Sequence, residues 1–252
     1  MCCRYVLLQA HTRSLLDQLG VLLSADALPP SRYNLPPGAG IPAIRTRPPA
    51  RSAASADPKC HPLGDTLPEP ARELTALRWG LVPSWARDDA SPAVNARAES
   101  LAEKPAFRDA FRTRRCLIPA SGFYEWKASG RAREPWFFRL RDERPFAFAG
   151  LWETWRAPDG HTLESCALVT TAPNSLMEPV HHRMPVILAG PAAWDAWLDP
   201  RLASPEALAS LLRPFPAEAM TAIAVNPRVN NIRNDDPACL SPAEEQQLSM
   251  GF

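Results

Sequence analysis

Cys2 follows the initiator residue Met1 directly. Because a cysteine side chain is small, we expect a methionine aminopeptidase to remove Met1 and leave Cys2 as the first residue. Cys2 then carries a free α-amine with a pKa of about 7.7–8.0 beside a thiol with a pKa of about 8.5. A 1,2-aminothiol reacts with aldehydes, since the amine forms a Schiff base and the thiol closes onto it as a five-membered thiazolidine. By its position alone, chance is the better explanation of Cys2.

Two further positions carry side chains suited to proton transfer. Glu125 lies among aromatic residues in a predicted strand, where loss of water would raise the pKa of its carboxyl group toward that of a general acid. An exposed glutamate on an edge strand explains this segment equally well. His181 and His182 are adjacent, and neighbours in an extended segment point to opposite faces. We therefore expect one of them to face a given site, and a purely structural histidine is the alternative.

Asn95 and Arg97 share a face if their segment is extended. An amide can orient an amine, and a guanidinium can clamp a phosphate; a helix-capping asparagine with a solvated arginine explains the same pair.

Most of the eight tryptophans are expected in the core, but one or two could stack on nucleobases. The aromatic and proline candidates are Tyr33, Pro36, Pro37, Trp79, Trp85 and Trp126.

Composition limits the class of protein. The chain has 252 residues, 46% of them hydrophobic, and a formal net charge of +1, enough for one large domain or two small ones. It lacks an apolar run near the ~20 residues of a membrane helix, and a signal-peptide pattern is absent, so we expect a soluble intracellular protein. All but three of the 28 basic residues are arginine. Codon bias explains most of this, but a local phosphate-binding groove stays possible.

The cysteines are scattered without C-x-x-C spacing, which favours reduced thiols over a disulfide framework or a zinc ribbon. A zinc site at Cys2, Cys3, His181 and His182 is disfavoured, because adjacent side chains of an extended chain diverge. We expect no metal ion or other cofactor. The six cysteines are Cys2, Cys3, Cys60, Cys116, Cys166 and Cys239.

The predicted elements favour the α+β class, because strands outnumber helices without alternating with them. A helix is expected from its N-cap Thr12 to about Leu23, and a loop over Pro29–Gly40. Asn95-Ala96-Arg97 is expected to precede helical segments. The predicted strands are Leu77–Val82, Arg115–Pro119, Gly122–Lys127, Trp136–Leu140, Phe146–Trp155, Ser165–Thr170 and Ala219–Val225.

Two later helices are predicted over Pro191–Leu198 and Pro205–Leu212, the second with Ser204 as its N-cap. Thr46–Pro70 is rich in Pro, Ala and Ser, and we expect an inserted mobile surface loop there. The chain from Asn234 is polar and expected to be loosely held.

Six sequence elements, in one order, resemble those of the SOS-response-associated peptidase (SRAP) family. The resemblance implies a single β-rich α+β domain with a twisted antiparallel, barrel-like core and flanking helices, over residues 1–235, followed by a polar tail over 236–252. The elements are Cys2 with Arg4; Arg32-Tyr33-Asn34 with Pro37; Trp79-Gly80-Leu81-Val82-Pro83 with Trp85; Asn95-Ala96-Arg97-Ala98-Glu99; Gly122-Phe123-Tyr124-Glu125-Trp126; and His181-His182-Arg183-Met184-Pro185.

The resemblance also implies a positively charged groove for single-stranded DNA and a covalent reaction with its abasic sites. An abasic deoxyribose equilibrates with an open-chain aldehyde, the partner that the Cys2 aminothiol requires. In such proteins the crosslink shields the lesion during the DNA damage response. We accordingly expect DNA with abasic sites as the partner, a monomer, and a cytoplasmic protein that associates with the nucleoid after damage.

The family's roles carry over to matching positions. Cys2 is then the nucleophile, Asn95 orients the amine, Glu125 is the acid and base of sugar-ring opening and of reversal, and His181 assists proton transfer. The resemblance further implies that Arg4 and Arg97 hold flanking phosphates, and that Pro37 and Trp85 shape the pocket or block continuing duplex.

One departure concerns Cys3, since the family usually has glycine there. Because the nitrogen of Cys3 is acylated, this residue cannot form a thiazolidine. Its thiol can still compete with the Cys2 thiol or act as its oxidation partner. Two alternative functions remain open. One is a cysteine peptidase, acting on itself or on other chains, with Cys2 as nucleophile and His181 as base. The other is a non-covalent reader of single-stranded or modified DNA, with binding that falls steeply with salt.

Overall fold

The computed structural model describes residues 3–24, 27–46, 71–130, 132–202 and 204–243. The expected inserted loop therefore lies, beyond Thr46, outside the described residues. The strands are β1 (Tyr5–Leu7), β2 (Arg32–Leu35), β3 (Gly40–Thr46), β4 (Arg72–Trp79), β5 (Asn95–Arg97), β6 (Arg115–Ala120), β7 (Gly122–Ser129), β8 (Ala132–Leu140), β9 (Phe146–Arg156), β10 (Thr162–Thr171), β11 (Met184–Pro185), β12 (Ile187–Leu188) and β13 (Met220–Ala224). The α-helices are α1 (Gln9–Gln18), α2 (Arg108–Thr113), α3 (Pro191–Leu198) and α4 (Pro205–Leu208).

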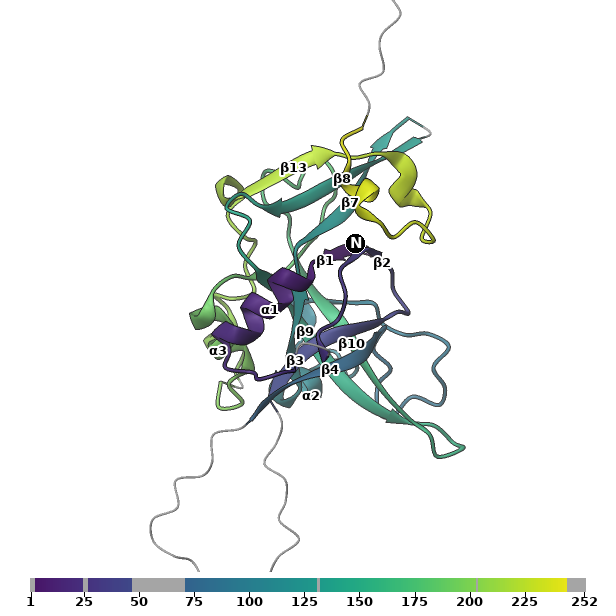
Figure 1. Cartoon of the computed structure of the whole chain (residues 1–252). Helices are drawn as coiled ribbons and strands as arrows, with labels where there is room; N and C mark the ends of the chain where they lie inside the picture. Colours follow the sequence, from purple (N-terminus) through teal and green to yellow (C-terminus); the bar gives the residue numbers. More distant parts are fainter. Residues whose placement is uncertain (1–2, 25–26, 47–70, 131, 203, 244–252) are drawn as a thin grey trace, which may run out of the picture.

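Five strands close a barrel. β4 pairs with β3, β3 with β6, β6 with β9, β9 with β10, and β10 returns to β4. These pairings are antiparallel except the last, which sets Cys166 beside Trp79 in parallel register. The barrel forms the lower part of the molecule in Figure 1, with β5, β11 and β12 paired to its strands. Closure satisfies the strand edges that an open sheet would expose.

Side chains of the barrel strands alternate between its interior and its outer face. On β6, Cys116 and Ile118 belong to the inner cluster, and Leu117 belongs to the outer cluster under the helices. Gly150 of β9 faces this interior, where an added Cβ would lie 2.8 Å from both the Cys116 Sγ and the Ile118 Cδ1. The packed interior therefore requires glycine at this position.

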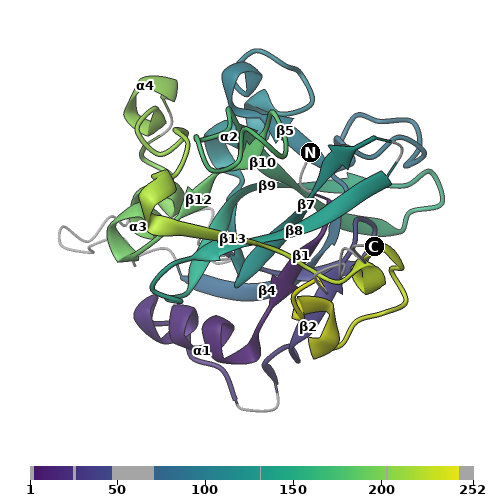
Figure 2. The same ribbon diagram turned by 90° about the horizontal axis from the view of Figure 1, so that it is seen from above.

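A second, five-stranded antiparallel sheet has the order β13-β8-β7-β1-β2. It crosses one end of the barrel, as Figures 1 and 2 show. Aromatic rings join the two sheets, since Tyr5 meets Trp79 and Phe148 edge to face at centroid distances of 5.6 and 5.7 Å. One shared core therefore holds the two sheets in a single domain, as the sequence predicted.

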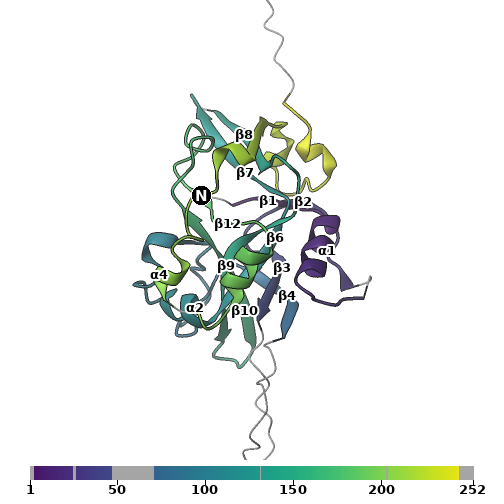
Figure 3. The ribbon, with the colours of Figure 1, turned by 90° about the vertical axis from the view of Figure 1, so that its left-hand side faces the viewer.

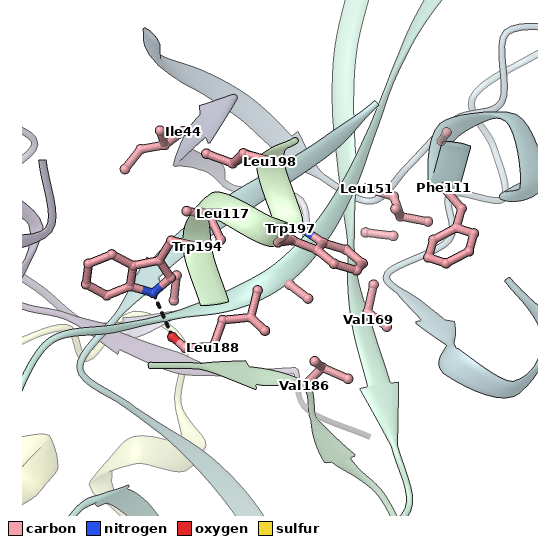
Figure 4. Packing of buried hydrophobic residues seen from close by; sticks show 14 of the residues in the cluster. Ile44, Phe111, Leu117, Leu151, Val169, Val186, Leu188, Trp194, Trp197 and Leu198 are labelled. Carbon is pink, nitrogen blue, oxygen red and sulfur yellow. Dashed lines mark hydrogen bonds between the residues drawn. The ribbon is translucent and has the colours of Figure 1, made fainter. Parts of the chain in front are cut away.

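Helices cover the outside of the barrel, with α1 and α2 on different flanks in Figure 3. α3 packs against the outer face through Trp194 and Trp197, shown in Figure 4. Their indole N–H groups donate to the Leu188 oxygen at 2.9 Å and the Cys116 oxygen at 3.0 Å. Both tryptophans are thereby buried without an unsatisfied donor.

The predicted strands between residues 115 and 171 are confirmed, and α3 has its predicted bounds. Ser204 caps α4, accepting from the Ala207 N–H at 3.2 Å, although this helix ends at Leu208 and not at Leu212. The helix predicted from Thr12 begins earlier, with Leu8 as its N-cap, and Thr12 is buried inside it. It also ends before Leu22, which is 95% exposed.

One further prediction was wrong, and one strand was not predicted, where a segment's partner is distant in sequence. The loop predicted over Pro29–Gly40 contains β2, which pairs with β1. Asn95–Arg97 is strand β5, because it pairs in parallel with β10. Neither short segment has a strand pattern of its own, so tertiary pairing decides.

The chain beyond residue 233 is packed where we expected a loosely held tail. Pro237–Leu240 forms a 3₁₀ turn capped by the Asp236 side chain, and Cys239 is fully buried. The Ala243 N–H donates to the Ala224 oxygen at 3.0 Å, at the end of β13. Residues 234–243 therefore belong to the folded domain.

Candidate functional site

Cys2 lies outside the described residues, but Cys3 is described, and the peptide bond keeps their Cα atoms about 3.8 Å apart. Cys3 is half-buried and precedes β1, where the second sheet meets the barrel. It lines an open pocket of about 400 Å³ with Arg4, Trp126, Arg133 and Asn230. Burial raises the pKa of the Cys3 thiol, and the nearby Glu125 charge adds to this. Cys3 is therefore a neutral thiol at physiological pH.

Glu125 lies on β7 and is only 3% exposed. Its cross-strand neighbour on β8 is Trp136, so an aromatic side chain flanks it on the same face. Burial raises the pKa of the Glu125 carboxyl group. The aromatic setting predicted this desolvated carboxyl; its catalytic role stays a prediction.

Asn95 and Arg97 lie on β5 and are not among the residues that line this pocket. β5 runs parallel to β10, with Asn95 beside Leu168 and Arg97 beside Thr170. The extended backbone places the two side chains on one face, as the spacing predicted. Asn95 is half-buried and Arg97 is exposed, so Arg97 can reach a ligand in solution. Their proposed contacts with DNA stay predictions.

His181 and His182 do not diverge. Their segment bends before β11, and their rings stack with centroids 4.4 Å apart. The expectation of opposite faces was wrong because it assumed an extended backbone. The Arg183 backbone N–H donates to His181 Nδ1 at 3.0 Å. Burial lowers the pKa of His181, and the positive charges of the N-terminus and of Arg133 lower it further, against the Arg183 backbone contact, which raises it.

A salt bridge joins the segments that carry Asn95 and His181. Arg183 donates to both carboxylate oxygens of Glu99, from Nη1 at 2.7 Å and from Nη2 at 2.9 Å. Its Nη2 also donates to the backbone oxygen of Thr170 on β10 at 2.7 Å. Thr170, fully buried, links these segments, and sequence reasoning missed it.

Arg4 bonds mainly within the protein. Its Nη1 donates to Asn34 Oδ1 at 2.7 Å and to the Val229 oxygen at 2.9 Å, and its guanidinium lies 5.6 Å from the Trp126 ring centroid. These contacts hold the residue after Cys3 against two walls of the pocket. Phosphate binding by Arg4 stays a prediction, since much of the guanidinium is already engaged.

The comparisons with known proteins agree with this architecture. Residues 1–232 match the family described as SOS response associated peptidase, SRAP. The chain belongs to this family.

Two relatives and two solved structures show the range of similarity. The abasic site processing protein YoqW of Bacillus subtilis (strain 168) is 46% identical over 167 residues, which cover 65% of this chain and 74% of YoqW. The abasic site processing protein HMCES of Mus musculus is 33% identical over 206 residues, 69% of this chain and 58% of HMCES. A Bacteroides thetaiotaomicron structure has a TM-score of 0.76 at 27% identity, covering 96% of this chain and all of that one. A Bordetella bronchiseptica structure has a TM-score of 0.68 at 26% identity, covering 89% and all, respectively.

The SRAP match ends at residue 232, but Asp235, which follows it, holds β2, whose Asn34 contacts the pocket residue Arg4. Asp235 accepts from the backbone N–H groups of Tyr33 and Asn34, at 2.5 and 2.9 Å, and from Arg32. Asn34 is fully buried and donates to the Val229 oxygen at 3.0 Å. The sequence marked Arg32-Tyr33-Asn34 but carried no signal for partners some 200 positions away.

The remaining candidates of the SRAP pattern differ in how far their side chains are exposed to solvent. Trp79 is fully buried, and its indole N–H donates to the Val94 oxygen at 3.0 Å, so it belongs to the core. Trp85 is 65% exposed and free to meet a ligand. Pro37 is half-buried, next to Gly38, whose N–H donates to the Trp79 oxygen at 2.7 Å. Roles for Pro37 and Trp85 toward DNA stay predictions.

Neither a metal site nor a membrane span is found among the described residues of this SRAP protein. No group of three or more His, Cys, Asp or Glu side chains there could hold an ion. The longest described helix, α1, has ten residues, and no described helix has the length and apolar content to span a bilayer.

Proposed function

We propose that this SRAP protein captures abasic sites in single-stranded DNA covalently through Cys2. The observation that carries the proposal is the position of Cys3, which ties the preceding aminothiol to an open pocket beside the buried Glu125. The names of YoqW and HMCES as abasic site processing proteins support the substrate.

The reaction balances without a cofactor. The Cys2 amine adds to the C1′ aldehyde of the opened sugar, and loss of one water gives the Schiff base. The Cys2 thiol then adds across the C=N bond, its sulfur bonding to C1′ and its proton passing to nitrogen. The product is a thiazolidine, formed with the net release of one water.

The site residues match these steps. Glu125, with its raised pKa, retains a proton nearer to neutral pH than an ordinary glutamate, so it can protonate the ring oxygen as the C1′–O4′ bond breaks. Asn95 orients the amine. His181 is neutral at physiological pH and can donate a hydrogen bond during water loss. Arg97 and Arg133 are exposed, which supports a role for both in binding phosphates.

A denaturing gel tests the proposal directly. Purified protein whose mass confirms removal of Met1 is mixed with single-stranded DNA carrying one abasic site. We expect a shifted band for the wild type and for Cys3→Ala, and none for Cys2→Ala or Cys2→Ser. Crosslinking by Cys2→Ala as efficient as by the wild type would refute capture through the aminothiol.

A second candidate function is peptidase activity, which the family description favours. Cys2 would then act as a thiol nucleophile with His181 as base. Cleavage of peptide substrates in trans, without DNA and dependent on Cys2, would support it. Salt-sensitive binding of single-stranded DNA with no denaturation-resistant species would instead indicate a non-covalent reader.

A further inference from the structure

Arg183 and Glu99 tie two catalytic segments together. Arg183 follows His181 by two residues and Glu99 follows Asn95 by four, and the two side chains form two parallel hydrogen bonds of 2.7 and 2.9 Å. A fork-to-fork contact of this kind fixes direction as well as distance. The pair therefore sets the His181 segment in a defined place relative to β5.

The Arg183 guanidinium is directed into the protein. Only 12% of its side-chain surface is exposed. Besides Glu99, it donates to the Thr170 oxygen at 2.7 Å, and Thr170 Oγ1 donates in turn to the Ala96 oxygen at 3.4 Å. Most of its donors are thus engaged by β10 and Glu99. Little of the guanidinium remains for a DNA phosphate, unlike that of the exposed Arg97.

The Arg183 backbone selects one form of the His181 ring. Its N–H donates to His181 Nδ1 at 3.0 Å, and an N–H group can only donate. A neutral imidazole with an accepting Nδ1 carries its proton on Nε2. The Arg183 oxygen is also 3.2 Å from Nδ1, a contact that serves only a ring protonated there. If Nδ1 carried the proton, the Arg183 N–H would point at another N–H group, so this shorter contact favours the Nε2–H tautomer.

We propose that Glu99 and Arg183 are positioning residues that hold His181 in place as its Nε2–H tautomer, a hydrogen-bond donor to the oxygen that leaves as water when the Schiff base forms. This inference rests on the proposed capture of abasic sites. Neither Glu99 nor Arg183 touches the lesion; both act through His181.

A double-mutant cycle tests the pair. Glu99→Gln keeps the side-chain size and removes the charge that grips Arg183, and Glu99 is exposed enough for the fold to tolerate it. We expect its crosslinking rate constant to fall about tenfold, as small misplacements of a reacting group do. In a His181→Ala background the same change is expected to cost nothing more. Glu103→Gln, an exposed glutamate four residues on, is the matched control.

Two further readouts separate positioning from DNA binding. Arg183→Lys is expected to slow crosslinking while leaving the dissociation constant for undamaged single-stranded DNA within about twofold. In ¹⁵N-labelled wild type, imidazole correlations are expected to show the proton of neutral His181 on Nε2, whether or not DNA is present.

Three results would overturn the inference. They are an equal rate loss for Glu99→Gln in both backgrounds, a loss of undamaged-DNA binding in Arg183→Lys that matches its rate loss, and a neutral His181 protonated at Nδ1. A wild type that forms no crosslink would contradict the proposed function instead, and the imidazole spectrum would still test the tautomer.

Discussion

Burial shifts the pKa values of Glu125 and His181 in opposite directions. It raises the pKa of the Glu125 carboxyl group and lowers that of the His181 imidazole. Both shifts favour the uncharged form, because a low-dielectric setting penalises charge. Near neutral pH, both groups can therefore donate a proton or a hydrogen bond to oxygen, as the proposed ring opening and water loss would require.

Glu125→Gln is expected to slow crosslinking at least tenfold, because glutamine cannot transfer a proton. It is also expected to stabilise the fold above neutral pH. The native carboxyl binds its proton more tightly than the unfolded one, so wild-type stability falls as pH rises from the ordinary glutamate pKa of about 4.3 through the raised native value. Thermal unfolding at pH 8 should show the variant melting a few degrees higher.

Glu134→Gln, at an exposed position of β8, is the control and should change neither quantity. A Glu125→Gln variant that melts lower than the wild type at pH 8 would show that the native carboxylate is stabilised by its contacts, contrary to the raised pKa. Unchanged crosslinking would remove Glu125 from the reaction.

Single residues were predictable where the signal is local. The aromatic neighbours of Glu125 predicted its burial, and the spacing of Asn95 and Arg97 predicted a shared face. The stacking of His181 on His182 was not predictable, since it depends on a bend that only tertiary contacts impose. The main partners of Arg4 were not predictable for a similar reason, since Val229 is 225 positions away in the sequence.

At the scale of elements, one buried arginine secures two helices to the barrel. Arg115 at the start of β6 is 5% exposed and donates only to backbone oxygens, namely those of Phe111, Arg112, Trp197 and Asp199. These carbonyls lie at the C-terminal ends of α2 and α3, which lack intrahelical donors. The guanidinium therefore caps both helices at once.

Arg115→Lys is expected to lower the free energy of unfolding by about 3 kcal/mol, because one ammonium cannot reach all of these carbonyls. Chemical denaturation measures the loss. Arg112→Lys, on the exposed face of α2, should cost less than about 0.5 kcal/mol. Equal losses for the two variants would show that the capping contacts contribute nothing specific.

Gly122, three residues before Glu125 on β7, allows β7 and β8 to approach closely. A Cβ at this position would lie 2.2 Å from Phe137 Cζ and 2.7 Å from the Phe138 oxygen. Gly122→Ala is expected to destabilise the fold by about 1–3 kcal/mol through overpacking, measured by thermal unfolding. The control is Gly40→Ala, where nothing lies within 4 Å. A neutral Gly122→Ala would show that the strands can separate at little cost.

The elements were predicted best between residues 115 and 171, where several strands with alternating side-chain patterns follow one another closely in the sequence. There, the period-two pattern and the short turns are both local signals. β2 and β5 were missed because they are short strands whose character comes from their partners. The parallel contact of β10 with β4, which closes the barrel, has no signature in either strand.

At the scale of the whole molecule, the two ends of the domain build the pocket together. Residues 229–235 bond to Arg4, Asn34 and the backbone of β2, and the Trp126 N–H donates to Asn230 Oδ1 at 2.6 Å. The segment that follows the SRAP match therefore contributes to the placement of the N-terminal residues.

Truncation of the chain tests whether the C-terminal segment supports the pocket. A chain ending after residue 232 loses the Asp235 contacts and the buried Cys239. It is expected to melt roughly 6–12 °C lower and to crosslink more slowly. A chain ending after residue 243 keeps these contacts and should match the full chain in melting temperature. If both truncations behave like the full chain, the C-terminal segment does not support the site.

The intact mass of the crosslink is the sharpest test of covalent capture through Cys2. Protein lacking Met1 is incubated with an abasic single-stranded oligonucleotide without any reductant, and the denatured product is weighed intact and mapped by proteolysis. We expect a mass equal to protein plus oligonucleotide minus one water, with the DNA attached at Cys2. Attachment at another residue, or the absence of an adduct that survives denaturation, would contradict it.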